Sequence, residues 1–253
     1  MKEIILREQI DRVLLVTLNR PNKRNALNVP LWLELQAVIK EAQNNNTIAA
    51  VVLTGSGGNF CAGTDNHDPI ASDLQKSPYE ACAKTIAAFD KPLLAAVNGT
   101  ATSVGAALTF HCDVVYVGES LRMRLAYTSM GLVPEFAASY MLANNIGAQR
   151  AAELFLTSEW IDADKAVEYG LAANKYSDDE LLEKTLIKAA QIAQWPINSL
   201  RETKHCLKIS QKTAIDTAFA REMAGTRKQA GSPENEEAKV ALMERRKPNF
   251  RNL

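Results

Sequence analysis

Two glycine-rich loops, about 40 residues apart, have the composition of an anion-binding centre. The first covers residues 55–65 and the second residues 97–107. Each follows an apolar run typical of a buried strand, and we expect each to open a helix. The first turn of a helix has unpaired N–H groups and the positive end of the helix dipole. Two such turns side by side would aim two backbone N–H groups at one oxygen, an arrangement that stabilises an enolate.

The elements around these loops follow from hydrophobic periodicity. Residues 4–8 and 13–18 predict two strands around a turn at Asp11, and residues 30–43 predict a helix with Asn28 as its N-cap. The apolar face of that helix consists of Leu31, Leu35, Val38, Ile39 and Ala42. A strand at 49–54 completes a strand–strand–helix–strand unit.

The rest of the chain repeats this organisation only in outline. We expect helices at 79–89 and 104–111, strands at 92–97 and 113–117, and a polar loop over a site at 66–78. After Pro134 the pattern is mostly helical, with one short strand at 172–176. The expected helices are 135–146, 148–157, 162–169, 179–193, 197–209, 213–230 and 233–246.

Composition narrows the class of protein. The 253 residues are 47% apolar and 23% charged, as in an ordinary globular protein. The 29 basic residues balance the 29 acidic ones, which argues against nucleic-acid binding. The four cysteines match no zinc pattern, so we expect no metal and a reduced compartment, the cytoplasm. We recognise neither a signal-peptide core nor a membrane-spanning run.

Several segments together resemble the crotonase family, which is also called the enoyl-CoA hydratase/isomerase family. The match extends over essentially the whole chain in order and spacing. The segments that carry it are residues 19–27 (NRPNKRNAL), 60–65 (FCAGTD), 97–99 (VNG), 112–116 (CDVVY), 148–151 (AQRA) and 244–248 (ERRKP).

The resemblance implies an α/β fold, a spiral of ββα units with a C-terminal helical trimerisation region. It divides the chain into a core at 1–195 and, at 196–253, a region for oligomerisation and part of the CoA site. The implied assembly is a homotrimer or a dimer of trimers. The implied ligand is an acyl-CoA thioester, with CoA as part of the substrate and no separate cofactor.

The family's site residues carry over by motif. The oxyanion hole would be the backbone N–H groups of Thr64 and Val104. Many relatives have glycines where this chain has Ser103 and Val104, and a β-branched Val104 restricts the backbone there. The remaining substrate-binding positions implied by the resemblance are Lys23, Arg24, Ala26, Ala62, Gly63, Asp65 and Tyr127.

The acid and base groups distinguish the reactions of such an enzyme. Hydratase members use two glutamates, whose positions fall here on Ala107 and Tyr127. Alanine has no ionisable group, and a phenol with a pKa of about 10 is a poor base near neutrality. The usual hydratase groups are therefore absent from their positions.

A single carboxylate is enough to move a double bond from C3–C4 to C2–C3, and Glu135 resembles the catalytic glutamate of the Δ3-Δ2-enoyl-CoA isomerase branch. We expect Glu135 to open a helix and to have a raised pKa among apolar neighbours such as Leu132 and Phe136. Its alternative role is a first-turn glutamate that only complements the helix dipole.

Three hypotheses remain at this point. The first is an isomerase with Glu135 as base, the second is a hydratase or another crotonase-type enzyme, and the third is a CoA-binding pseudoenzyme. A second carboxylate close to Glu135 would favour the second. The cluster of Asp65, His67 and Asp68 is more typical of an exposed turn than of a catalytic pair.

Overall fold

A six-stranded sheet forms the centre of the computed structural model, which describes residues 3–68, 78–251 and 253. Its strand order is β1-β2-β3-β4-β6-β9. The first pair is an antiparallel hairpin and every later pair is parallel. The strands are β1 (Ile5–Ile10), β2 (Val13–Leu18), β3 (Ala50–Gly55), β4 (Leu93–Val97), β6 (Val114–Gly118) and β9 (Asn174–Tyr176).

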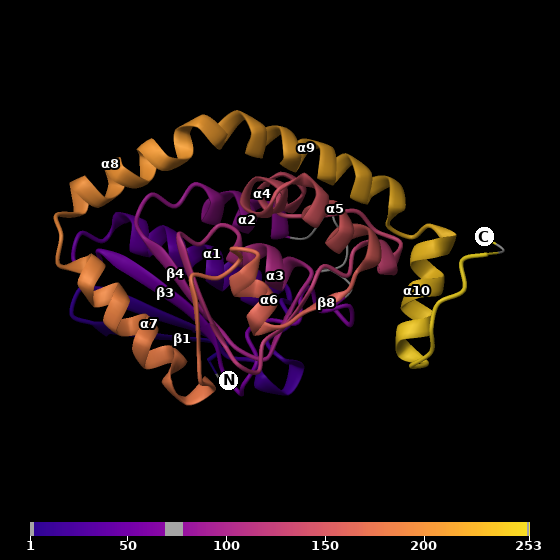
Figure 1. Cartoon of the computed structure of the whole chain (residues 1–253), viewed down its shortest axis with the longest axis horizontal. Coiled ribbons are helices and arrows are strands. Elements are labelled where there is room, and N and C mark those ends of the chain that lie inside the picture. Colours follow the sequence, from indigo (N-terminus) through magenta and orange to yellow (C-terminus); the bar gives the residue numbers. More distant parts are fainter. Residues whose placement is uncertain (1–2, 69–77, 252) are drawn as a thin grey trace.

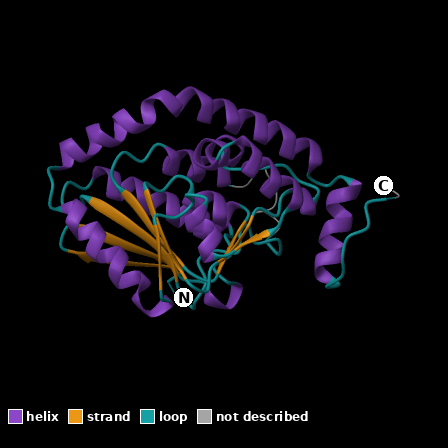
Figure 2. Ribbon diagram, viewed as in Figure 1, coloured by secondary structure: helices purple, strands orange, loops and turns teal. Residues whose placement is uncertain are grey.

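Both faces of this sheet are covered, which explains its nearly continuous apolar strands. On one face Val52 and Leu94 pack against Ala189 and Ala193 of α7 (Asp178–Ala193). The alternate residues of β3 and β4 join the main core with α1 (Val29–Asn44). Helix α7 lies along the sheet in Figure 1, and Figure 2 shows the sheet between helices.

Helix α1 confirms the periodicity argument in detail. The Asn28 side chain accepts a hydrogen bond from Leu31 N at 3.2 Å and so caps the helix. The five residues of its predicted apolar face are all buried. Amphipathic spacing and an Asx cap are local signals, which is why both could be read without the structure.

A second, three-stranded sheet was not predicted. It consists of β5 (Thr100–Thr102), β7 (Arg122–Arg124) and β8 (Trp160–Ile161), in the order β5-β7-β8. Strands of two or three residues give too short a pattern to detect by alternation. The sheet matters for the site because β5 leads directly into α3 (Val104–Thr109).

The C-terminal half is helical, as predicted. In Figure 1, α8 and α9 form one long arc over the rest of the chain, while α10 lies at the end of that arc near the C-terminus. The other helices are α2 (Tyr79–Ala87), α4 (Ala138–Ile146), α5 (Ala148–Thr157), α6 (Ala163–Glu168), α8 (Ile197–Lys208), α9 (Lys212–Gln229) and α10 (Pro233–Met243), with 3-10 turns η1 (Pro21–Lys23), η2 (Thr128–Met130) and η3 (Ile209–Gln211).

Two local predictions were wrong. The first glycine-rich loop does not open a helix directly, because residues 64–68 form an isolated bridge and turns. Glu135 does not open α4, which begins three residues later at Ala138. The predicted loop at 66–78 falls mostly outside the described residues. Across the described ranges, no helix has the length and apolar character needed to cross a membrane.

Candidate active site

The two glycine-rich loops lie side by side in parallel. Cys61 pairs with Ala101, with Cys61 N donating to Thr100 O at 2.9 Å and Thr102 N donating to Cys61 O at 3.0 Å. The loops remain adjacent beyond this bridge, because Thr102 Oγ1 donates to Ala62 O at 2.8 Å. Gly63 fits closely at this point, because a Cβ there would meet Thr102 O at 3.0 Å and its φ is +89°.

The bridge between Thr64 and Leu27 does not use the Thr64 amide. Thr64 forms a parallel bridge with Leu27, and the hydrogen bonds of that bridge involve the residues before and after Thr64. Leu27 N donates to Gly63 O at 2.8 Å, and Asp65 N donates to Leu27 O at 3.0 Å. The Thr64 N–H therefore points away from Leu27, and it has no backbone partner in the described part of the chain.

The Val104 amide lacks a partner for a different reason. Val104 is the first residue of α3, so its N–H has no intrahelical acceptor, and none of the side chains that the structure describes caps this end of α3. The unusual backbone conformation falls one residue earlier, at Ser103, with φ 50° and ψ −120°. Val104 itself is helical and fully buried. Its β-branched side chain belongs to the core and does not line the cavity described next.

A cavity of about 140 Å³ brings together four of the predicted site residues: Ala62, Thr64, Tyr127 and Glu135. Ser103, next to Val104, also lines it. Glu135 is the one carboxylate in the described lining, which agrees with a single acid–base group. The sequence did not identify the other polar lining residues, which are Asn66, Tyr79, Thr226, Asn235 and Lys239.

Burial is the main reason that the pKa of Glu135 rises from 4.5 to about 7, and the nearby charge of Glu222 raises it further. A carboxyl with a pKa near neutrality can both accept and return a proton at physiological pH. The predicted direction of this pKa change is therefore confirmed. The alternative role of Glu135, a glutamate in the first turn of a helix that only complements the helix dipole, does not apply, because Glu135 precedes α4.

A strained turn carries Glu135. The two residues after it, Phe136 and Ala137, have φ values of 68° and 54°, the left-handed region that favours glycine. Two side chains hold this turn: Phe136 N donates to Tyr79 Oη at 2.8 Å, and Phe136 O is 2.7 Å from His111 Nε2. Burial lowers the pKa of His111 to about 4, so the ring is neutral and Nε2–H is the donor.

Tyr127 is buried against Phe155 and lines the cavity beside Glu135. Burial, followed by the charges of Glu135 and Glu222, raises the pKa of its phenol well above 10. The hydroxyl faces the Glu135 backbone but forms no hydrogen bond of good geometry within the described residues. A neutral phenol in this position cannot act as the second base of a hydratase.

The other residues that the sequence predicts to bind the substrate lie beside the cavity and not in its lining. The segment of Lys23, Arg24 and Ala26 adjoins Ala62, whose N–H donates to Arg24 O at 2.9 Å. Asp65 is buried in an ion pair with Arg20 at 2.9 Å. A CoA-binding role for these residues and for Gly63 stays a prediction.

The Asp65–His67–Asp68 cluster forms a turn, as expected, but the turn is not wholly exposed, because Asp65 is buried. Asp65 Oδ1 accepts from His67 N at 3.1 Å, and Asp68 Oδ2 accepts from Val29 N at 3.0 Å. Cys61 is buried, and burial raises the pKa of its thiol to about 12, so it is not a nucleophile. Within the described residues, no group of three His, Cys, Asp or Glu side chains is placed to hold a metal.

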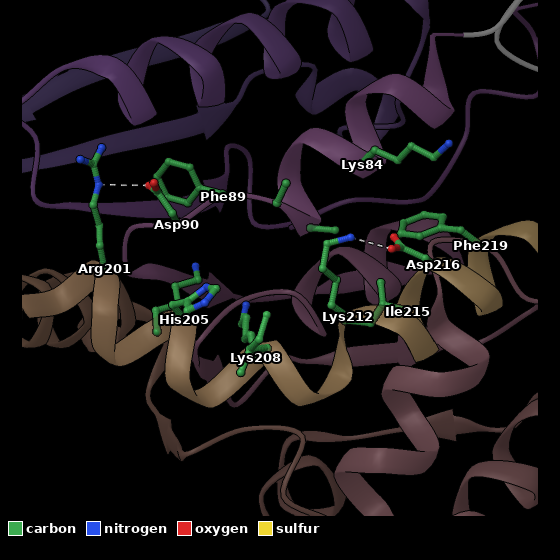
Figure 3. A pocket seen from close by; sticks show the side chains of 14 residues that line it. Lys84, Phe89, Asp90, Arg201, His205, Lys208, Lys212, Ile215, Asp216 and Phe219 are labelled. Carbon is green, nitrogen blue, oxygen red and sulfur yellow. Dashed lines mark hydrogen bonds and ion pairs between the residues drawn. The ribbon is translucent and has the colours of Figure 1, made fainter. Parts of the chain in front are cut away.

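A larger cleft of about 400 Å³ lies between the end of α2 and the helices α8 and α9 (Figure 3). Its charged groups largely pair with acidic side chains, as Lys212 does with Asp216 at 2.7 Å and Arg201 with Asp90 at 3.3 Å. Neither unpaired amide nor Glu135 reaches it, so the smaller cavity is the better candidate for chemistry.

The comparisons with known proteins agree with this combination of fold and site. The family model described as enoyl-CoA hydratase/isomerase matches residues 8–252. The chain belongs to this family, the crotonase family, whose members act on acyl-CoA thioesters.

Individual relatives cover nearly the whole chain. It is 34% identical to 2,3-dehydroadipyl-CoA hydratase of Escherichia coli K12, over 99% of both chains. It is 30% identical to 1,2-epoxyphenylacetyl-CoA isomerase of the same organism, again over 99% of both. An enoyl-CoA hydratase/isomerase from Pseudoalteromonas atlantica T6c superposes with a TM-score of 0.93 at 33% identity, covering 98% of this chain and 100% of that one. The predicted crotonase-like fold is thus confirmed.

Proposed function

We propose that this protein is a Δ3-Δ2-enoyl-CoA isomerase in which Glu135 is the catalytic base. The observation that carries the proposal is the cavity lining, where Glu135 is the one carboxylate among the described residues. The two positions that hold glutamates in hydratase members are Ala107, which is buried in α3, and Tyr127, which is a neutral phenol.

The reaction needs two proton transfers by one group. Ionised Glu135 removes a proton from C2 of a 3-enoyl thioester, the electron pair of that C–H bond moves into the C1–C2 bond, and the carbonyl π pair moves onto the thioester oxygen. The protonated carboxyl then returns the proton to C4: the oxygen pair re-forms the carbonyl, the C1–C2 pair becomes the C2–C3 double bond, and the C3–C4 π pair forms the new C–H bond. Carboxylate and enzyme are regenerated, and no water is consumed. A pKa of about 7 suits both halves of this cycle.

The negative charge that develops on the thioester oxygen would be held by the backbone N–H groups of Thr64 and Val104. Their lack of backbone partners in the described chain supports this role, as does the adjacency of the two loops at the Cys61–Ala101 bridge. One such donor typically contributes about 10²–10³ in rate. Because both donors are backbone groups, they are already oriented before the substrate binds.

The CoA-binding residues, the assembly and the cellular location are also proposals. CoA would lie along Lys23, Arg24 and Ala26 as part of the substrate, with no separate cofactor. A homotrimer or dimer of trimers in the cytoplasm, without nucleic-acid or membrane partners, is the expected setting.

The test is turnover of a panel of 3-enoyl-, 2-enoyl- and dienoyl-CoA thioesters by wild type and Glu135→Gln. The expected result is conversion of 3-enoyl-CoA to the conjugated trans-2-enoyl-CoA, with a loss of about 10²–10⁴ in kcat in the variant. Glu202→Gln, an exposed change on α8, is the matched control. Equal isomerase rates in wild type and Glu135→Gln would exclude Glu135 as the base.

Hydration of 2-enoyl-CoA is the second candidate, and two observations favour it. Relatives named as hydratases match 93–99% of the chain. Glu222 of α9 also supplies a second carboxylate close enough to raise the pKa of Glu135. Glu222 does not line the cavity, however, which ranks hydration below isomerisation. Faster loss of crotonyl-CoA absorbance than of 3-enoyl-CoA would reverse the ranking, and CoA binding without turnover would indicate a pseudoenzyme.

A further inference from the structure

The turn that carries Glu135 is held from three directions. Tyr79 from α2 and His111 from the end of α3 bind the backbone of Phe136. The third contact comes from α9, where Glu222 Oε1 accepts a hydrogen bond from Ser139 N at 2.8 Å. Ser139 lies in the first turn of α4, immediately after the left-handed residues Phe136 and Ala137.

Glu222 is an unusual residue to find in such a position. It is 6% exposed, and its second oxygen, Oε2, is buried without a hydrogen-bond partner among the described residues. A buried carboxylate with one oxygen left without a partner costs free energy, so a purely structural cap would be better served by a neutral side chain. One turn later, Thr226 of the same helix lines the cavity, which places Glu222 directly behind the cavity wall.

We propose that Glu222 is a positioning residue for Glu135: it fixes the first turn of α4, and its buried carboxylate faces the turn from which Glu135 projects. The proposal rests on the assignment of Glu135 as the base. A neutral cap would supply the hydrogen bond to Ser139 but not the charge. The carboxylate supplies the hydrogen bond, and in its ionised form its charge opposes ionisation of Glu135. Burial raises the pKa of Glu222 itself, while hydrogen bonds from Ser139 and Ala137 favour its ionised form.

The other titratable groups around the turn do not supply that charge. Burial raises the pKa of Tyr79 and Tyr127 well above 10 and lowers that of His111 to about 4, so all three are neutral at pH 7. His111 is in turn faced by two lysines of α8 and by Asp113, and Lys208 and Lys204 both pair with Asp113. On the open side of the cavity, Lys239 of α10 pairs with Glu236 at 2.8 Å.

Two variants separate the hydrogen bond from the charge. Glu222→Gln keeps an acceptor oxygen for Ser139 N–H and removes the charge, whereas Glu222→Ala removes both. The matched control is Asp216→Asn, which removes an exposed negative charge from the same helix. Asp216 lies at the cleft in Figure 3, away from the cavity of Glu135.

The main measurement is the titration of Glu135 by ¹³C NMR of glutamate labelled at the side-chain carboxyl carbon, assigned by the signal missing in Glu135→Gln. In Glu222→Gln the pKa of Glu135 is expected to fall below about 7 and stay above 4.5, because burial remains its larger cause. Asp216→Asn leaves it unchanged. This titration needs no substrate, so it decides the proposal even if the isomerase assignment fails.

The second measurement addresses the hydrogen bond. Amide exchange at Ser139 is expected to accelerate in Glu222→Ala but not in Glu222→Gln. With active substrate, Glu222→Ala should lose roughly 10-fold or more in kcat, and Glu222→Gln should shift its pH profile to lower pH. An identical Glu135 titration in wild type and Glu222→Gln would overturn the proposal. Unchanged exchange at Ser139 in Glu222→Ala would overturn it as well, and if Glu222→Ala fails to fold, the titration still decides.

Discussion

Ionisation of Glu135 should destabilise the folded protein, and the cost follows from its surroundings. The pKa of about 7 in the folded chain compares with 4.5 for a freely solvated glutamate. At 1.36 kcal/mol per pKa unit, the difference corresponds to about 3 kcal/mol. Because the folded state binds this proton more tightly than the unfolded state, the contribution is fully present below about pH 4.5. It is lost progressively as the pH rises to about 7.

The perturbation that exposes this cost is Glu135→Gln, since glutamine resembles the protonated carboxyl and cannot ionise. At pH 8 the variant should be more stable than wild type by up to about 3 kcal/mol, equivalent to a melting temperature higher by on the order of 10 °C. At pH 5 most of the difference should vanish, because Glu135 is then largely protonated in the folded protein. The ionised carboxylate of Glu135 would thus serve catalysis and lower the stability of the fold.

Thermal melts of wild type, Glu135→Gln and the exposed control Glu202→Gln, at pH 5 and pH 8 and at one protein concentration, measure this directly. The concentration is fixed because assembly would shift the melting temperature. A variant less stable than wild type at pH 8, or an advantage of equal size at both pH values, would refute the reasoning. Either result would mean that the carboxylate is better solvated or better paired than its burial indicates.

Two further predictions follow from particular contacts. The value of kcat/KM for the favoured thioester should rise about ten-fold per pH unit below pH 7 and level off above pH 7, because only ionised Glu135 accepts the proton. A value of kcat/KM that does not change between pH 5 and pH 8 would contradict this prediction. Lys91→Met should lower the free energy of unfolding by roughly 2–4 kcal/mol in denaturant titrations, since it leaves three carbonyl oxygens at the end of α1 without their donor. Lys91 Nζ donates to Ala42 O at 2.6 Å, to Asn45 O at 2.7 Å and to Ile48 O at 2.9 Å. If Lys91→Met were as stable as wild type, water would have to replace the ammonium as donor to these carbonyls.

The sequence was most informative where the signal is local. Amphipathic helices, apolar strands and the Asn28 cap are set by residues a few positions apart, and all could be predicted. The convergence of Thr64, Tyr127 and Glu135 on one cavity also agrees with the family resemblance. What the sequence could not provide was the set of long-range contacts. Glu222 and Ser139 are 83 residues apart, and Tyr79 and Phe136 are 57 residues apart, so no spacing rule connects them.

The backbone conformations at the site were the hardest feature to anticipate. Left-handed φ values normally indicate glycine, but here they fall on Ser103, Phe136 and Ala137. Such conformations persist only when surrounding contacts determine them. The Phe136 ring packs between Trp32 and Phe219 while its N–H and C=O are both bound by side chains. The strain is visible only once those partners are known.

The C-terminal helices take part in the site of their own chain. Besides Glu222, helix α9 contributes Thr226 to the cavity wall, and Asn235 of α10 donates to Met130 O at 2.8 Å beside the same cavity. A boundary at residue 195 therefore separates the proposed base from the groups that position and enclose it. If α8–α10 also mediate assembly, contacts between subunits would act on the same helix that holds the turn of Glu135. Oligomerisation and catalysis would then depend on one element, because a displacement of α9 alters the cavity wall and the Ser139 hydrogen bond together.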